Sequence, residues 1–61
     1  MYKFYFRTAF TKEVFTSEST NYKVAKHEYE QHVLQRLPIR AYLDYVWKCD
    51  SDGNAVERVA I

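Results

Sequence analysis

Residues 39–49 read Ile-Arg-Ala-Tyr-Leu-Asp-Tyr-Val-Trp-Lys-Cys, and they carry the clearest alternation of apolar and polar residues in the chain. Successive side chains of a strand point to opposite faces of its sheet. One predicted face is apolar and holds Ile39, Ala41, Leu43, Tyr45, Trp47 and Cys49. The other is mostly polar and holds Arg40, Tyr42, Asp44, Val46 and Lys48. We therefore expect a half-buried antiparallel strand at the centre of the fold, with Trp47 largely buried in the core.

Three further stretches favour strands. In residues 2–8, Tyr2, Phe4 and Phe6 lie on one predicted side and Lys3, Tyr5 and Arg7 on the other. Residues 12–16 form a shorter β-favouring run. The connection at 9–11 has no Gly, Asn or Pro, which disfavours a tight primed turn and leaves a longer loop, a bulged bend or one long bent strand. Residues 50–54, Asp-Ser-Asp-Gly-Asn, predict a turn. Residues 55–61 then return as an edge strand.

Residues 20–36 favour a helix because apolar residues recur there at steps of three and four. This stripe consists of Tyr22, Ala25, Tyr29, Val33 and Leu37. Cap-forming residues fill positions 16–21, and the α region is disfavoured just before Pro38. The chain therefore predicts a single α+β domain over residues 1–61, in the order β-β-α-β-β. We expect one antiparallel sheet, its strand order open, with the helix packed on one face.

The length and composition of the chain bear on the stability of this domain and on its location in the cell. A chain of 61 residues buries only about 60% of its unfolded surface, so self-association would help to stabilise it. Cys49 is the single cysteine, which excludes an internal disulfide. We expect its side chain to be buried as a small hydrophobic group. This cysteine usage favours a reducing compartment for the protein. No apolar run approaches the ~20 residues of a membrane helix, and the N-terminus lacks the pattern of a signal peptide. We expect a cytoplasmic protein without membrane contact.

The residues that could carry chemistry do not combine into a site. An EF-hand loop counted from Asp50 needs Gly at position six and Glu at position twelve, but Gly53 is fourth and Ile61 is twelfth. His27 and His32 diverge by about 140° on a helix and cannot share a metal, while Glu28 and His32 predict only a surface contact. A single Gly rules out a glycine-rich phosphate loop. We therefore expect that the protein is not an enzyme and that it has no catalytic residue, metal or cofactor.

The sheet face away from the helix is the best candidate for a binding site. Its predicted partner-binding residues mix tyrosine with basic side chains: Lys3, Tyr5, Arg7, Arg40, Tyr42, Lys48 and Arg58. Tyr and Arg are typical of protein-binding hot spots. The same mixture can stack bases and neutralise phosphates of single-stranded RNA or DNA. It also fits a plain solvated face stabilised by cross-strand pairs. The net charge of +1 favours a protein partner over a nucleic acid.

In size and aromatic content the chain is similar to small phage proteins that bind and inhibit a host enzyme, although no shared motif transfers any residue. That resemblance implies a viral inhibitor that occupies the surface of a host protein, in the host cytoplasm if a phage encodes it. The weakly protected final strand further predicts a symmetric homodimer formed through an edge strand.

Overall fold

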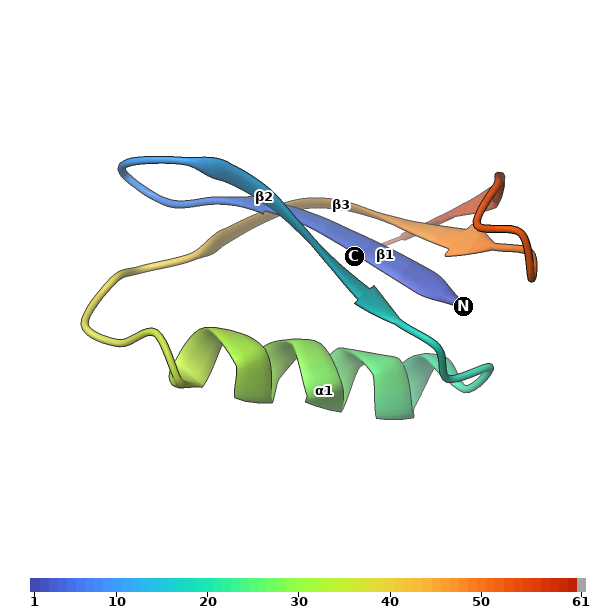
Figure 1. Cartoon of the computed structure of the whole chain (residues 1–61), viewed down its shortest axis with the longest axis horizontal. Helices are drawn as coiled ribbons and strands as arrows, with labels where there is room; N and C mark the ends of the chain where they lie inside the picture. The colour runs from blue at the N-terminus through green and yellow to red at the C-terminus, as the bar shows by residue number, and fades with distance from the viewer. Residues whose placement is uncertain (61) are drawn as a thin grey trace.

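A computed structural model describes residues 1–60 and shows four strands and one helix. In chain order these are β1 (Tyr2–Arg7), β2 (Lys12–Ser17), α1 (Tyr22–Leu34), β3 (Tyr42–Cys49) and β4 (Ala55–Val59). The strands form one antiparallel sheet in the order β2-β1-β3-β4. The helix crosses one face of the sheet (Figure 1). The predicted α+β class and the β-β-α-β-β order are confirmed, and residue 61 lies outside the described part of the predicted final strand.

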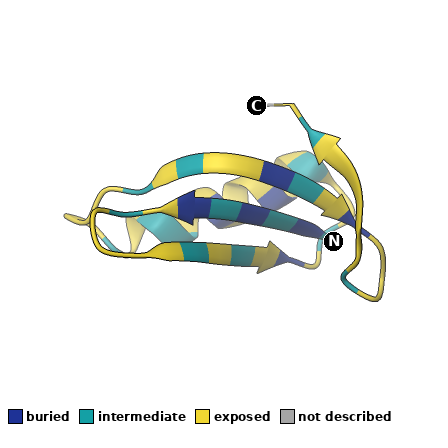
Figure 2. Cartoon of the chain, turned by 90° about the horizontal axis from the view of Figure 1, so that it is seen from above, coloured by how far each residue is buried: buried dark blue, intermediate teal, exposed yellow. Residues whose placement is uncertain are grey.

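The core lies between β1 and α1. The alternate residues Tyr2, Phe4 and Phe6 are buried on the helix side of β1, and they pack against Ala25 and Tyr29 of α1. The rings of Phe4 and Tyr29 stack with centroids 4.9 Å apart. Large rings allow a short chain to remove much apolar area from water. The predicted centre of the fold was residues 39–49, but the most buried strand is β1, which runs between β2 and β3 (Figure 2).

The predicted strand at 39–49 is three residues too long at its start. Successive turns extend the end of α1, with Leu37 N–H donating to the Leu34 carbonyl and Ile39 N–H to the Arg36 carbonyl. Because these backbone groups are engaged locally, pairing with β1 begins only at Tyr42, opposite Arg7.

One extra residue in β3 changes which side chains face the helix. Tyr5 lies opposite Tyr45, but the next residue, Phe6, lies opposite Leu43, so Asp44 is unmatched. Such a β-bulge interrupts the two-residue alternation of the strand that contains it. Leu43 therefore faces α1, as predicted, and the next core residue is three positions later.

The next core residue of β3 is Val46, which is fully buried opposite Phe4. The prediction that Tyr45 and Trp47 face the core is wrong, because both lie on the side away from α1, opposite Tyr5 and Lys3. Trp47 is half-buried there. The bulge reverses every face assignment between residues 45 and 48.

The helix begins and ends slightly inside its predicted limits of 20–36. Asn21 caps it, because its Oδ1 accepts from the backbone N–H groups of Lys23 at 2.9 Å and Val24 at 3.3 Å. The predicted stripe is confirmed for Ala25 and Tyr29, which are buried. Leu37 lies beyond the helix and is exposed.

An ion pair connects the C-terminal end of α1 to β2. The Arg36 guanidinium donates to the Glu13 carboxylate, and both side chains are partly shielded from water. The hydrogen bond from Arg36, with a second from the Thr11 hydroxyl, holds the pKa of Glu13 below its ordinary value. Neither residue was singled out from the sequence, because they lie 23 positions apart.

Both hairpin connections are stabilised by local hydrogen bonds. The Thr8 hydroxyl oxygen accepts from the N–H groups of Phe10 and Thr11, each at 3.1 Å, which settles the first connection as a four-residue loop. At the second, Gly53 has φ of 86° and donates its N–H to the Asp50 carbonyl. That conformation suits glycine, so the turn predicted at 50–54 is confirmed.

Candidate functional site

The outer face of the sheet, meaning the side away from α1, is not covered by any element within residues 1–60 (Figures 1 and 2). Strand register orders its side chains into three rows that run across the sheet. From the hairpin end, these rows are Lys12–Arg7–Tyr42, then Val14–Tyr5–Tyr45, then Thr16–Lys3–Trp47–Arg58. The outer face therefore has an aromatic centre flanked by cations at both ends.

The aromatic centre is preorganised by stacking. The rings of Tyr5 and Tyr45 stack with centroids 4.8 Å apart and an interplanar angle of 27°. The Arg58 guanidinium sits 5.2 Å from the centre of the Tyr45 ring, a cation–π contact. Trp47 lies between Lys3 and Arg58 in the next row. Aromatic side chains already held in place lose little conformational freedom when a partner covers them.

The charges of the chain are unevenly distributed over its two faces. Among residues 1–60, the outer face carries Lys3, Arg7, Lys12 and Arg58 against the single carboxylate of Asp44. Arg7 Nε lies 3.3 Å from Asp44 Oδ1, and Lys3 Nζ donates to the Gly53 carbonyl at 3.1 Å. The whole chain has a net charge of only +1. Folding thus concentrates positive charge on the face that no element of the described chain covers.

The structure brings together five of the seven residues predicted to bind a partner. Those on the outer face are Lys3, Tyr5, Arg7, Tyr42 and Arg58. Arg40 precedes β3 and lies beside Tyr42 at the hairpin end. Lys48 is misplaced in the prediction, because it pairs with the buried Tyr2 and so belongs to the helix side of the sheet.

Sequence reasoning missed Tyr45 and Trp47 as members of the outer face. A strict two-residue alternation assigns both to the core, and Asp44 carries no local mark of a bulge. One signal was available: Val46, a β-branched apolar residue, stood among the charged residues of the predicted outer side. A bulge before Val46 would have explained that exception.

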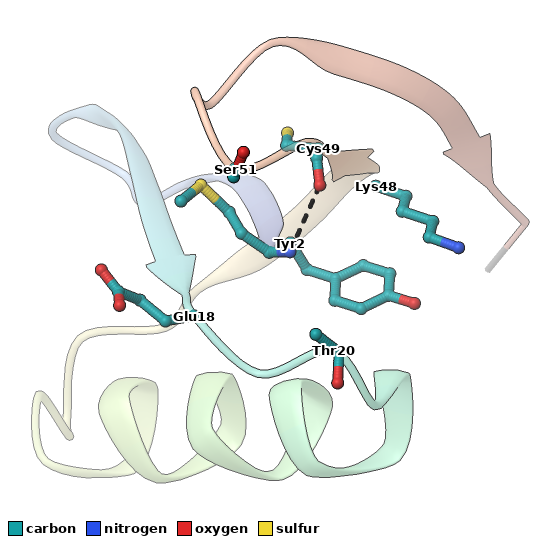
Figure 3. A pocket seen from close by; sticks show the side chains of 7 residues that line it. Tyr2, Glu18, Thr20, Lys48, Cys49 and Ser51 are labelled. Carbon is teal, nitrogen blue, oxygen red and sulfur yellow. Dashed lines mark hydrogen bonds between the residues drawn. The ribbon is translucent and has the colours of Figure 1, made fainter.

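A separate hollow of about 540 Å³ lies between the N-terminus, the β3–β4 turn and the start of α1 (Figure 3). The N-terminal ammonium donates to the Cys49 carbonyl at 3.2 Å, shown as the dashed line in Figure 3. Cys49 is buried, as predicted, and its thiol contacts the Trp47 carbonyl at 3.7 Å. No histidine lines this hollow, so the thiol has no adjacent imidazole to activate it.

The helix histidines do not form a metal centre either. His32 stacks on Phe15 with centroids 4.8 Å apart, which makes it part of the packing between α1 and β2. Glu28 accepts from the Ser17 hydroxyl. Within residues 1–60 there is no cluster of three or more His, Cys, Asp or Glu side chains suited to a metal ion.

Comparison with known proteins finds no match among protein-family models, curated proteins or solved structures. Within the described part of the chain, α1 is too short and too polar to cross a bilayer. The outer face therefore has to be interpreted from its own chemistry. The protein is a small domain of one sheet and one helix, and the sheet has an aromatic and basic outer face that no element within residues 1–60 covers.

Proposed function

We propose that the protein is a protein-binding module that occupies a partner's surface with its outer face. The observation that supports this most directly is the preorganised cluster of Tyr5, Tyr45 and Arg58 on a face with no covering element within residues 1–60. Tyr, Trp and Arg are the residue types that dominate binding hot spots. A stoichiometric inhibitor of the kind that phages direct against host enzymes, acting in the cytoplasm, would use such a surface.

A second candidate function is binding of single-stranded nucleic acid by the same face. The observation in its favour is the excess of four cations over one carboxylate beside four aromatic residues, counted over the described part of the outer face. Stacked rings next to Lys and Arg are the usual means of holding unpaired bases and their phosphates. However, Lys3 and Arg7 already contact Gly53 and Asp44, and the net charge is small. We therefore rank this function second.

Affinity capture with matched variants tests the proposed function. The tagged wild-type chain and its Tyr45→Ser variant are exposed to an extract of the native host, with and without nuclease. We expect a protein bound in stoichiometric amount by the wild type, resistant to nuclease and lost with Tyr45→Ser. Because Val24 on α1 is 48% exposed, Val24→Ser serves as a control and should retain the partner. Capture that depends on nucleic acid would favour the second candidate.

We also propose a symmetric homodimer formed through β4. This strand pairs only with β3 among the described residues, and its residues Ala55–Arg58 are exposed. In a continuous antiparallel sheet related by a twofold axis, residues opposite one another lie on the same face. If the twofold axis passed beside Glu57 or Arg58, that residue would lie opposite its own copy, and the like charges would repel each other. An axis beside Val56, which is 63% exposed, avoids this.

Light scattering at high micromolar concentration tests the dimer. We expect twice the monomer mass for the wild type and the monomer mass for Val56→Lys, because two ammonium groups would then meet at the centre of the interface. The exposed position of Val56 allows the variant to fold, which circular dichroism checks. A strict monomer for the wild type would exclude this assembly.

A further inference from the structure

An apolar groove at the hairpin end has no role in the fold so far described. It has a volume of about 400 Å³ and is lined by Ala9, Phe10, Pro38, Ile39, Arg40 and Tyr42. The β1–β2 loop and the segment between α1 and β3, far apart in sequence, lie at the same end of the molecule (Figure 1), and both line the groove. The volume is within the range of ligand-binding clefts, roughly 300–1,000 Å³.

The groove presents large apolar side chains to water. Phe10 is 81% exposed and Tyr42 is 49% exposed, and Leu37, next to the groove residue Pro38, is 61% exposed. Two hydrogen bonds to the Thr8 hydroxyl hold the loop that carries Phe10. Exposed apolar side chains that gather at one place on a small protein are typical of a binding site.

The charges around the groove define what can occupy it. Arg40 is its only charged lining residue. Arg7 and Lys12 lie directly opposite each other in the adjacent row, although like charges in that position are unfavourable. Of the carboxylates nearby, Asp44 is bound to Arg7 and Glu13 to Arg36. The surroundings of the groove are therefore complementary to an anion.

These observations discriminate between possible occupants. A second copy of the chain would bring Arg40 against the same basic residues, which disfavours self-association here. A nucleic-acid base would stack on the rings of Phe10 and Tyr42. However, three of the six lining residues, Ala9, Pro38 and Ile39, are aliphatic and suit a branched or bulky apolar side chain better than a flat base. A large apolar side chain of a protein packs against those residues, and a neighbouring carboxylate satisfies Arg40.

We propose that this groove is the anchor subsite for the protein partner and receives a large apolar side chain adjacent to a carboxylate. The inference rests on the proposed protein-binding function, and it extends the interface from the outer face, through Tyr42, to the hairpin end. The partner segment it fits is a short acidic stretch with an aromatic or branched apolar residue.

A titration with two small probes tests this subsite without requiring the partner. N-acetyl-tryptophan carries an indole and a carboxylate, whereas N-acetyl-tryptophanamide carries the same indole without the charge. In two-dimensional NMR of the full chain, we expect both to shift the amide signals of residues 8–11 and 39–42. The carboxylate form should bind about two- to fivefold more tightly, the ratio that an exposed ion pair supplies.

Three variants complete the experiment. Arg40→Gln should bind both probes equally, and Phe10→Ser should bind neither. Val24→Ser, which alters an exposed residue on α1 outside every proposed interface, should behave as the wild type. Absence of shifts at these amides, or equal binding of both probes by the wild type, would overturn the subsite. Stronger shifts of the same amides by oligothymidylate would also overturn it and indicate a nucleic acid.

The outcome is separable from that of the proposed function. If the probes fail while Tyr45→Ser still abolishes partner capture, the outer face is retained and the anchor subsite is rejected. If the probes bind as expected but no nuclease-resistant protein depends on Tyr45, the proposed function fails, and the inferred partner subsite fails with it.

Discussion

Tyr5 and Tyr45 stack on the outer face with their ring centroids 4.8 Å apart. This pair exists because the unmatched Asp44 turns Tyr45 away from α1. Without the bulge, strict alternation from Leu43 through Asp44 would bury Tyr45 and expose Val46. The same bulge thus determines both the composition of the core and the chemistry of the candidate binding surface.

Adjacent substitutions in β3 test the bulge directly. We expect Val46→Asp to prevent folding, because an unpaired carboxylate would be buried opposite Phe4. Tyr45→Asp should leave the chain folded, since Tyr45 is 37% exposed. Circular dichroism and urea denaturation provide the measurement. The reverse order, with Tyr45→Asp unfolded and Val46→Asp folded, would restore the strict alternation of the strand.

Acid should weaken the connection between α1 and β2. The folded pKa of Glu13 lies below its ordinary value of 4.5, chiefly because of the hydrogen bond from Arg36. The stabilisation from this pair is therefore complete above the unfolded pKa and is lost as the pH falls through the folded pKa. We expect the free energy of unfolding of Glu13→Gln to depend less on pH below about 4.5 than that of the wild type. Glu30→Gln, an exposed change on α1, is the control, and equal slopes for Glu13→Gln and the wild type would contradict the prediction.

Tyr42 connects the outer face to the apolar groove, so its removal should weaken partner binding without unfolding the chain. We expect Tyr42→Ala to cost more than ~1 kcal/mol of binding free energy, as hot-spot truncations do. Its side chain is 49% exposed, so the melting temperature should change little. Val24→Ala, at a position of 48% exposure on α1, is the matched control for calorimetry with the captured partner. Equal affinities of both variants would remove Tyr42 from the interface.

Salt dependence separates the two candidate functions. Each phosphate neutralised in a single strand contributes a slope of about 0.7 to the log–log plot of affinity against salt, so four outer-face cations would give roughly three. We expect the captured protein partner to show a shallow slope, because ring burial dominates its affinity. Tight binding of a single-stranded oligonucleotide at physiological salt, with a steep slope reduced by Arg58→Gln, would reverse the ranking.

Much of the local structure could be predicted from the sequence because it depends on neighbours along the chain. The cap at Asn21, the stripe of Ala25 and Tyr29, and the turn at Gly53 each follow from short-range geometry. The alternation of Tyr2, Phe4 and Phe6 likewise identified a strand and its buried side. These features determined the element order and the α+β class.

Tertiary structure alone decided the register of β3 against β1. A bulge arises when two strands remote in sequence match their side chains, so its position depends on the partner strand and on the packing beneath it. Here Phe4 and the helix select Val46 for the core, which leaves Tyr45 and Trp47 on the outer face. The fold also brings the loop with Phe10 and the segment with Arg40 together at one groove, since 30 positions separate these two residues in the sequence. The chain by itself determined which elements form, and packing between distant strands decided which residues reach the surface together.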